Sequence, residues 1–279
     1  MKLITITIFL VFLLSLSSFI GKNKINIPPG TIKLKENFYV DQTEVRNVDY
    51  REYLYWLNRI YGSTSEEFMS ALPDTNVWDC VNIRYIEKYL RHPHYANFPV
   101  VGITQMQAEN YCKWRSDRVY EWIMVEKKII KWTTSKDTIF TIDNFLNGKY
   151  PTLKKLKKEE YYPIPNYSLL SKEEWEFAAS SNLDISKYEN GMKDISKTKL
   201  NFKENCNDYT VAVDKSGIND FKLYGMIGNV AEIISEPNIA KGGSWFHSKT
   251  DCGILSNIKY TKPMPWLGFR CKCEWKHNK

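Results

Sequence analysis

The sequence predicts an irregular α+β domain with short strands, few helices and long loops. Three observations lead to this class. Short apolar or alternating segments are interrupted by glycine or proline, few segments carry the apolar repeat of a helix, and long polar stretches separate them. With 279 residues, 43% of them hydrophobic and 14% aromatic, the chain has enough apolar material for a packed core, which excludes a globally disordered protein.

The amino terminus has the order of a secretory signal. Lys2 precedes an apolar run from Leu3 to Leu16, and small residues follow at Ser17 and Ser18. The run is shorter than the roughly 20 residues that a spanning helix needs. An uncleaved anchor is the alternative interpretation.

We therefore expect a signal peptide over residues 1–21 and a single domain over residues 22–279. The expected location is the periplasm or cell envelope, with no transmembrane span after cleavage. The first cysteine is Cys80, so there is no lipobox cysteine to carry a bacterial lipid anchor.

The net charge of +7 does not predict a nucleic-acid partner. The basic excess lies largely between Gly148 and Tyr162, and no aromatic-basic binding motif accompanies it. We interpret it as part of a Lys-rich, solvated insertion at about residues 125–166.

The first half of the chain predicts a hairpin and a helix. Apolar alternation from Ile32 to Val40 follows a Pro-Pro-Gly turn, which favours two antiparallel strands. Apolar residues at helical spacing follow from Val48, with Asn47 as the expected N-cap and Gly62 as the end.

The next elements are a short strand over Val100–Ile103 and a helix capped by Thr104. Farther on, Ser171 and Glu174 form the capping-box pattern of another helix start, and Trp175 is expected in the core. Short strands broken by glycine complete the carboxyl-terminal part.

The six cysteines lack the paired spacing of a zinc site, and in an exported protein disulfides are the expected state. They are Cys80, Cys112, Cys206, Cys252, Cys271 and Cys273. The last two are expected to be neighbours on one strand and to have different partners, unless one of them is free.

Six blocks occur in the order of one known family. They are "FYVDQTEVRNVDYREYL", "FPVVGITQMQAENYCKW", "LLSKEEWEFAA", "LYGMIGNVAEI", "GGSW" and "LGFRC", between about residues 32 and 273. Together they resemble the formylglycine-generating enzyme, or sulfatase-modifying factor, domain. The resemblance implies an irregular relative of the C-type lectin fold.

A narrower likeness lies in "LPDTNVWD", "YLRHPHYANFPVVGI" and "YCKWRSDRV". These stretches resemble the branch found in gliding-motility and type IX secretion lipoproteins. The likeness implies a structural or assembly role with envelope or secretion-machinery proteins as partners. Those relatives carry a lipid-modified cysteine, and this chain does not.

The resemblance also implies where catalysis would occur. The enzymes use two cysteines, five residues apart, after the "GGS" block, to hold copper and engage a substrate cysteine. Here Cys252 stands at the first position and Asn257 at the second. An amide is a hard, neutral ligand, and one sulfur cannot supply the two thiolates that Cu(I) favours.

We therefore expect no catalytic residue and no copper cofactor, and we leave open whether the protein is an enzyme. Cys252 is a vestigial candidate: either a lone reactive thiol or, as we favour, part of a disulfide with Cys206 or Cys80. The alternative function is a copper- or iron-dependent oxidase of this family acting on an exported substrate.

Iron ligation is not expected. The iron-dependent relatives need several histidines from a separate helical domain, whereas this chain has four in total: His92, His94, His247 and His277. Pro93 predicts an extended backbone between the first two, so their side chains need not converge and a surface role is expected.

Two further features follow from the resemblance. Cys112 and Cys271 match the family's structural disulfide. The carbonyls of Gly228 and Val230 with the carboxylate of Glu232 match a calcium-binding turn, a ligand type that suits Ca²⁺. The family's Asp or Asn three residues earlier is Gly225 here, which weakens that site. The alternative is that Glu232 caps local backbone amides.

Overall fold

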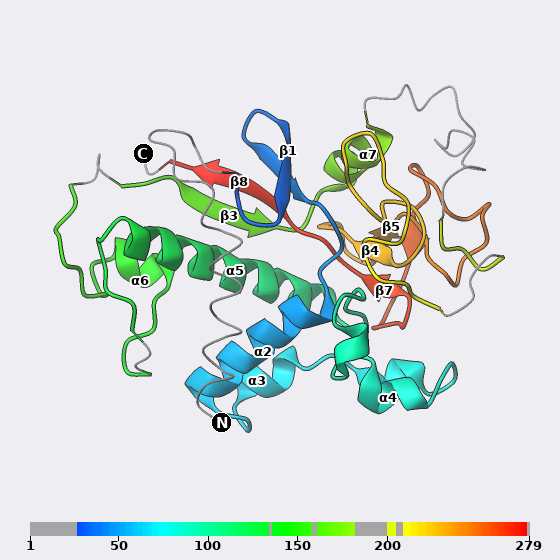
Figure 1. The fold of residues 1–279 in the computed structure, drawn as a ribbon, viewed down its shortest axis with the longest axis horizontal. Coiled ribbons are helices and arrows are strands. Elements are labelled where there is room, and N and C mark those ends of the chain that lie inside the picture. The colour runs from blue at the N-terminus through cyan, green and yellow to red at the C-terminus, as the bar shows by residue number, and fades with distance from the viewer. Residues whose placement is uncertain (1–26, 134–135, 158–160, 182–199, 205–208, 278–279) are drawn as a thin grey trace.

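The computed structural model describes residues 27–133, 136–157, 161–181, 200–204 and 209–277. Within them the chain forms short strands and few long helices, as the sequence predicts (Figure 1). The expected signal peptide lies outside the described residues. Among the described residues, no helix combines the length and apolar composition needed to cross a bilayer.

The first sheet has the order β1-β2-β8-β3 and is antiparallel throughout. The predicted hairpin is confirmed as β1 and β2, and the carboxyl-terminal strand β8 lies between β2 and β3. The bounds are Thr31–Lys35 for β1, Phe38–Asp41 for β2, Ile164–Ser168 for β3 and Lys272–Lys276 for β8.

The second sheet has the order β6-β5-β4-β7, with β4 and β7 parallel. Its strands have two or three residues each: Ala231–Ile233 for β4, Ile239–Lys241 for β5, Ile258–Lys259 for β6 and Leu267–Gly268 for β7. The segment from β7 to β8 connects the two sheets, so residues at positions 269–271 lie at the junction between them (Figure 1).

Helices cover the first sheet from below in Figure 1. The longest, α5 (Gln105–Glu126), packs against β3 and against α2 (Asn47–Tyr61), which in turn contacts α3 (Glu66–Ala71). Thr104 caps α5 as predicted. The other helices are α4 (Arg84–Lys88), α6 (Ile142–Leu146) and α7 (Lys172–Ser180), with 3-10 turns at Thr75–Trp78 and Pro93–Tyr95.

The capping box of α7 is confirmed in both directions. Ser171 Oγ accepts from the Glu174 amide at 3.3 Å, and the Glu174 carboxylate accepts from the Ser171 amide at 2.7 Å. Trp175, on the buried face of this helix, is fully buried as predicted.

Asn47 is not the cap of α2. Arg46 holds that position, and the Asn47 side chain instead donates to the carbonyls of Tyr89 and Tyr95, each at 3.0 Å. The amide therefore joins α2 to a later segment. The expected strand over residues 100–103 is also wrong: these residues are buried, but the only bridge nearby pairs Arg46 with Pro99.

The Lys-rich segment around residues 125–166 contains a small apolar core of its own. Phe140, Phe145 and Tyr150 pack on Tyr120 and Met124 at the end of α5. Its last residues, from Ile164, belong to β3. The segment therefore combines exposed lysines with a core that fixes it to the long helix.

Candidate functional site

Cys252 lies in an apolar cluster behind the "GGS" segment. Its side chain is fully buried with Leu200, Phe202 and the partly buried Ile227. Gly243, at φ 70°, lies directly over the sulfur: a Cβ at this position would overlap the Cys252 side chain. The glycine therefore brings the backbone down onto the thiol.

The environment of this thiol opposes ionisation. Burial, with smaller contributions from the nearby Asp251 and Glu204 carboxylates, raises the pKa of Cys252 to about 12. The thiol makes only long contacts with the carbonyl oxygens of Ser244 and His247 in the described residues, at 3.9 Å and 4.0 Å from Sγ. The thiolate is the nucleophilic form of cysteine, so burial of Cys252 as a neutral thiol disfavours reaction at this sulfur.

The expected disulfide of Cys252 is not formed with Cys80. Both are free thiols, and Cys80 is exposed whereas Cys252 is buried. Cys206, the other expected partner, lies outside the described residues.

Asn257 has a structural contact of its own. Its Oδ1 accepts from the Lys241 ammonium at 3.2 Å, and the same ammonium is ion-paired with Glu176 at 2.8 Å. Lys241 is fully buried, so it needs both partners to offset the loss of hydration. The amide at the second cysteine position therefore stabilises a buried cation.

The turn expected to bind calcium leads into β4, and Gly228 at its start has φ 81°. Glu232 is buried, and its carboxylate accepts from Arg270 Nε at 2.8 Å and 2.7 Å, from a terminal Arg270 nitrogen at 2.5 Å, and from Trp175 Nε1 at 2.8 Å. Both oxygens are engaged, and a guanidinium occupies the side where a cation would bind. These residues do not fit a calcium ion.

The alternative interpretation of Glu232, that it caps local backbone amides, does not describe these contacts either. Its carboxylate accepts from the side chains of Arg270 and Trp175, which come from distant parts of the chain. Arg270 is fully buried and also donates to the carbonyls of Asp41 at 3.1 Å and Tyr224 at 2.6 Å. The pair thus links both sheets.

Sequence reasoning missed Glu44 and Asn229. Glu44, between β2 and α2, accepts from Asn229 Nδ2 at 2.9 Å and is buried beside Gly225. A Cβ on Gly225 would lie 2.5–2.7 Å from the carboxyl atoms of Glu44. The glycine that replaces the family's Asp or Asn makes room for this carboxyl group; no local signal around Glu44 indicates it.

Cys112 and Cys271 face one another at the packing of α5 on the first sheet. Both are buried, and their Sγ atoms lie 3.3 Å apart as thiols. A disulfide needs about 2 Å between sulfurs. The arrangement is compatible with the pair that the resemblance implies, and the bond itself stays a prediction.

The two histidines of "RHPHY" are exposed, on a 3-10 turn. The backbone at His92 is extended, and its Nδ1 accepts from the His94 amide at 3.2 Å. Within the described ranges, no group of three or more His, Cys, Asp or Glu side chains is placed to hold a metal ion.

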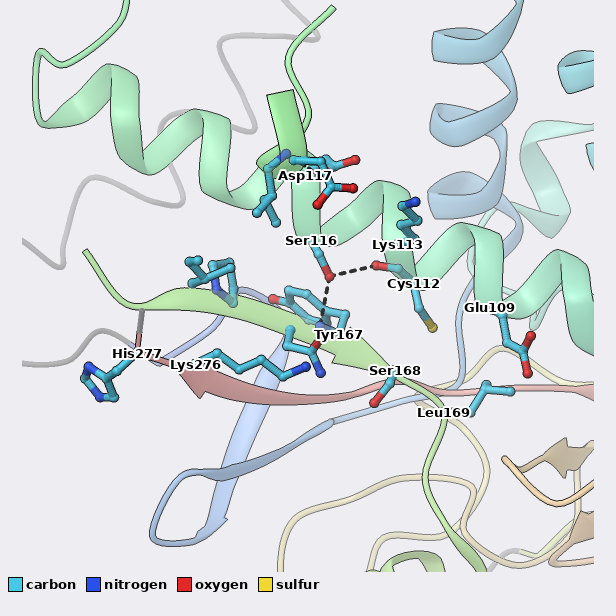
Figure 2. Close-up of a pocket in the computed structure, with 15 residues that line it drawn as sticks. Glu109, Cys112, Lys113, Ser116, Asp117, Tyr167, Ser168, Leu169, Lys276 and His277 are labelled. Atoms are coloured by element: carbon cyan, nitrogen blue, oxygen red, sulfur yellow. Dashed lines mark hydrogen bonds between the residues drawn. The ribbon is translucent and has the colours of Figure 1, made fainter. Parts of the chain in front are cut away.

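A groove of about 430 Å³ lies elsewhere, between α5 and β3 (Figure 2). Ser116 spans it, accepting from the Tyr167 amide at 2.9 Å and donating to the Cys112 carbonyl at 3.0 Å. Its lining includes Cys112 but neither Cys252 nor Asn257. The groove is therefore distinct from the position at which the family resemblance places catalysis.

No curated protein matches the chain. Among solved structures, variable protein 1 of Treponema denticola is 15% identical over 89% of this chain and 92% of that one, with a TM-score of 0.46. CarF is 16% identical over 85% and 86%, with a TM-score of 0.47. PvdO from Pseudomonas aeruginosa is 16% identical over 64% and 63%, with a TM-score of 0.38.

The family match is more extensive. Residues 14–274 match the FGE-sulfatase family, described as a sulfatase-modifying factor enzyme 1-like domain. This match confirms the expected domain type and its irregular, C-type-lectin-like α+β fold. The chain belongs to the FGE-sulfatase family.

Proposed function

We propose that this protein is an exported, non-catalytic member of the family that acts as a structural or protein-binding component of the bacterial cell envelope. The observation that carries the proposal is the state of Cys252. It is fully buried beneath Gly243, and burial raises its pKa to about 12. A buried neutral thiol is neither presented to a substrate nor paired with the second thiolate that Cu(I) favours.

The second catalytic position supports the same proposal. Oxidation of a substrate cysteine by the copper route needs a second sulfur, and Asn257 offers an amide oxygen that is engaged with Lys241. Both positions are therefore used for internal contacts. The alternative, a copper- or iron-dependent oxidase, would require the loop around Cys252 to open and another ligand to replace the missing thiolate.

The location and partner class come from the sequence. The leader over residues 1–21 supports export, and the stretches "LPDTNVWD" and "YLRHPHYANFPVVGI" support a role like that of gliding-motility and type IX secretion proteins. Envelope or secretion-machinery proteins are the proposed partners.

The catalytic half of the proposal is tested with purified full-length protein, Cu(I), dioxygen and a cysteine-containing peptide. We expect no conversion of the cysteine to formylglycine by mass spectrometry, and no change in this result for the Cys252→Ala variant. Aldehyde formation that depends on Cys252 would overturn the proposal.

The location and partner half needs the protein in its own cells. Fractionation is expected to place it in the envelope, and chemical crosslinking in intact cells is expected to join it to a defined envelope protein. A purely cytoplasmic pool without such crosslinks would contradict the proposed location and partner, and it would not affect the proposal that the protein is non-catalytic.

A further inference from the structure

Glu44 is a buried carboxyl group with incomplete partners. It is 1% exposed, in the turn between β2 and α2. One oxygen accepts from Asn229, and the other, Oε2, has no hydrogen-bond partner among the described residues. A buried unpaired carboxylate costs far more free energy than a neutral acid in the same place.

The charged groups around Glu44 do not neutralise it. Arg270 and Glu232 face it from the β7–β8 connection and from β4, and Tyr89 faces it from the end of α4. The hydrogen bonds of Arg270 go to Glu232 and to the carbonyls of Asp41 and Tyr224, and none goes to Glu44. Two carboxyl groups, those of Glu44 and Glu232, thus lie near one guanidinium, and that guanidinium forms its carboxylate hydrogen bonds with Glu232.

Glu44 lies where the two sheets meet, so a change in its charge would affect how the sheets pack. The next residue, Val45, donates to the Phe269 carbonyl at 2.9 Å, and Asn229 precedes β4 of the second sheet. Glu44 and Asn229 are separated by 185 residues in the chain. Their contact therefore helps to fix the second sheet against the first.

We propose that Glu44 is a proton-binding site: a neutral carboxylic acid holds the junction between the two sheets, and release of its proton loosens that junction. Gly225 leaves the space for the acid, and Asn229 orients it. The inference is independent of the proposed envelope function.

The direction of the pH effect follows from the raised pKa. Burial raises the pKa of Glu44 from 4.5 to about 8, opposed by Arg270 and increased by Glu232. Because the folded state binds the proton more tightly than the unfolded state, this contribution to stability is complete below pH 4.5. It decreases as the pH rises and is lost above about pH 8.

The test compares wild type with Glu44→Gln, whose amide has the shape of the neutral acid and cannot ionise. Urea unfolding of the full chain is measured between about pH 5 and about pH 9. The folding constant of wild type, divided by that of the variant, is expected to fall about tenfold per pH unit up to about pH 8 and then level off. A ratio that does not change with pH would overturn the proposal.

A control and a second measurement complete the test. Glu121→Gln removes another buried carboxyl, ion-paired with Arg118 at 2.5 Å, and this variant is expected to keep the alkaline loss of stability. If Glu44→Gln does not fold, infrared spectra of wild type show whether the folded protein contains a neutral carboxylic acid. A neutral carboxylic-acid band present at about pH 6 and absent at about pH 9 supports the proposal, and absence of the band at both contradicts it.

Discussion

The Cys252 pocket and the Glu232–Arg270 junction occupy the two places where family resemblance implies chemistry, and they differ in character. The first is apolar and closed over an unpaired thiol. The second contains buried charges joined by short hydrogen bonds. In both, the side chains are used for internal contacts. The comparison teaches that sequence blocks can keep their positions in the fold while their residues make contacts as different as apolar packing and buried charge pairing.

The junction is expected to be the more sensitive of the two. Arg270→Met leaves Glu232 as an unpaired buried charge, and the expected loss is about 3–5 kcal/mol of unfolding free energy. Urea unfolding measures it. The double variant Glu232→Gln with Arg270→Met is the control: removing both charges should recover part of the loss. A single variant as stable as wild type would mean that the pair contributes nothing.

The closure over Cys252 is tested by Gly243→Ala. The added methyl would overlap the Cys252 side chain, and φ 70° disfavours a Cβ, so we expect a loss of about 2–4 kcal/mol. Gly148→Ala is the matched control, because Gly148 has φ 67° with open space around it, and only the conformational part of the loss is expected there. Equal losses at both positions would show that the contact with Cys252 has no effect.

The apolar character of the pocket is tested by Cys252→Ser. A buried hydroxyl has only the distant Ser244 and His247 carbonyls as acceptors, so we expect a loss of about 1–3 kcal/mol. Cys252→Ala, measured by the same thermal unfolding, tests the volume alone and is expected to cost less. A serine variant at least as stable as the alanine variant would contradict the apolar description.

The smallest effect is expected for Asn257→Cys, which restores the paired cysteines of the sequence pattern. The buried Lys241 ammonium loses one of its two acceptors, the amide of the exposed Asn257, and the expected loss of unfolding free energy is about 1 kcal/mol. No formylglycine is expected, because Cys252 stays buried. Asn257→Asp keeps an acceptor for Lys241 and should be as stable as wild type. Oxidase activity gained by Asn257→Cys would show that Cys252 is accessible.

Local signals predicted much of the fold. The caps at Thr104 and Ser171 and the hairpin of β1 and β2 depend on residues close in sequence, and the structure contains them. Asn47 shows the limit: its residue type suits a cap, but its amide is used by carbonyls more than 40 positions away.

The candidate site was less predictable for the same reason. The loss of the second cysteine is visible in the sequence, but the burial of Cys252 and the contact of Asn257 with Lys241 depend on the closed fold. Likewise, Glu44 meets Asn229 across 185 residues, and Glu232 meets Arg270 across 38. No periodicity or spacing indicates such pairs.

Thiol labelling of native protein, followed by peptide mass mapping, tests most directly the central claim that Cys252, at the position of the family's first cysteine, is closed off from solvent. At about pH 8, roughly one in ten thousand Cys252 side chains is ionised if its pKa is about 12. We predict that exposed Cys80 is modified within minutes, whereas Cys252 stays unmodified until denaturant is added. Modification of Cys252 in the native protein as fast as that of Cys80 would contradict the account.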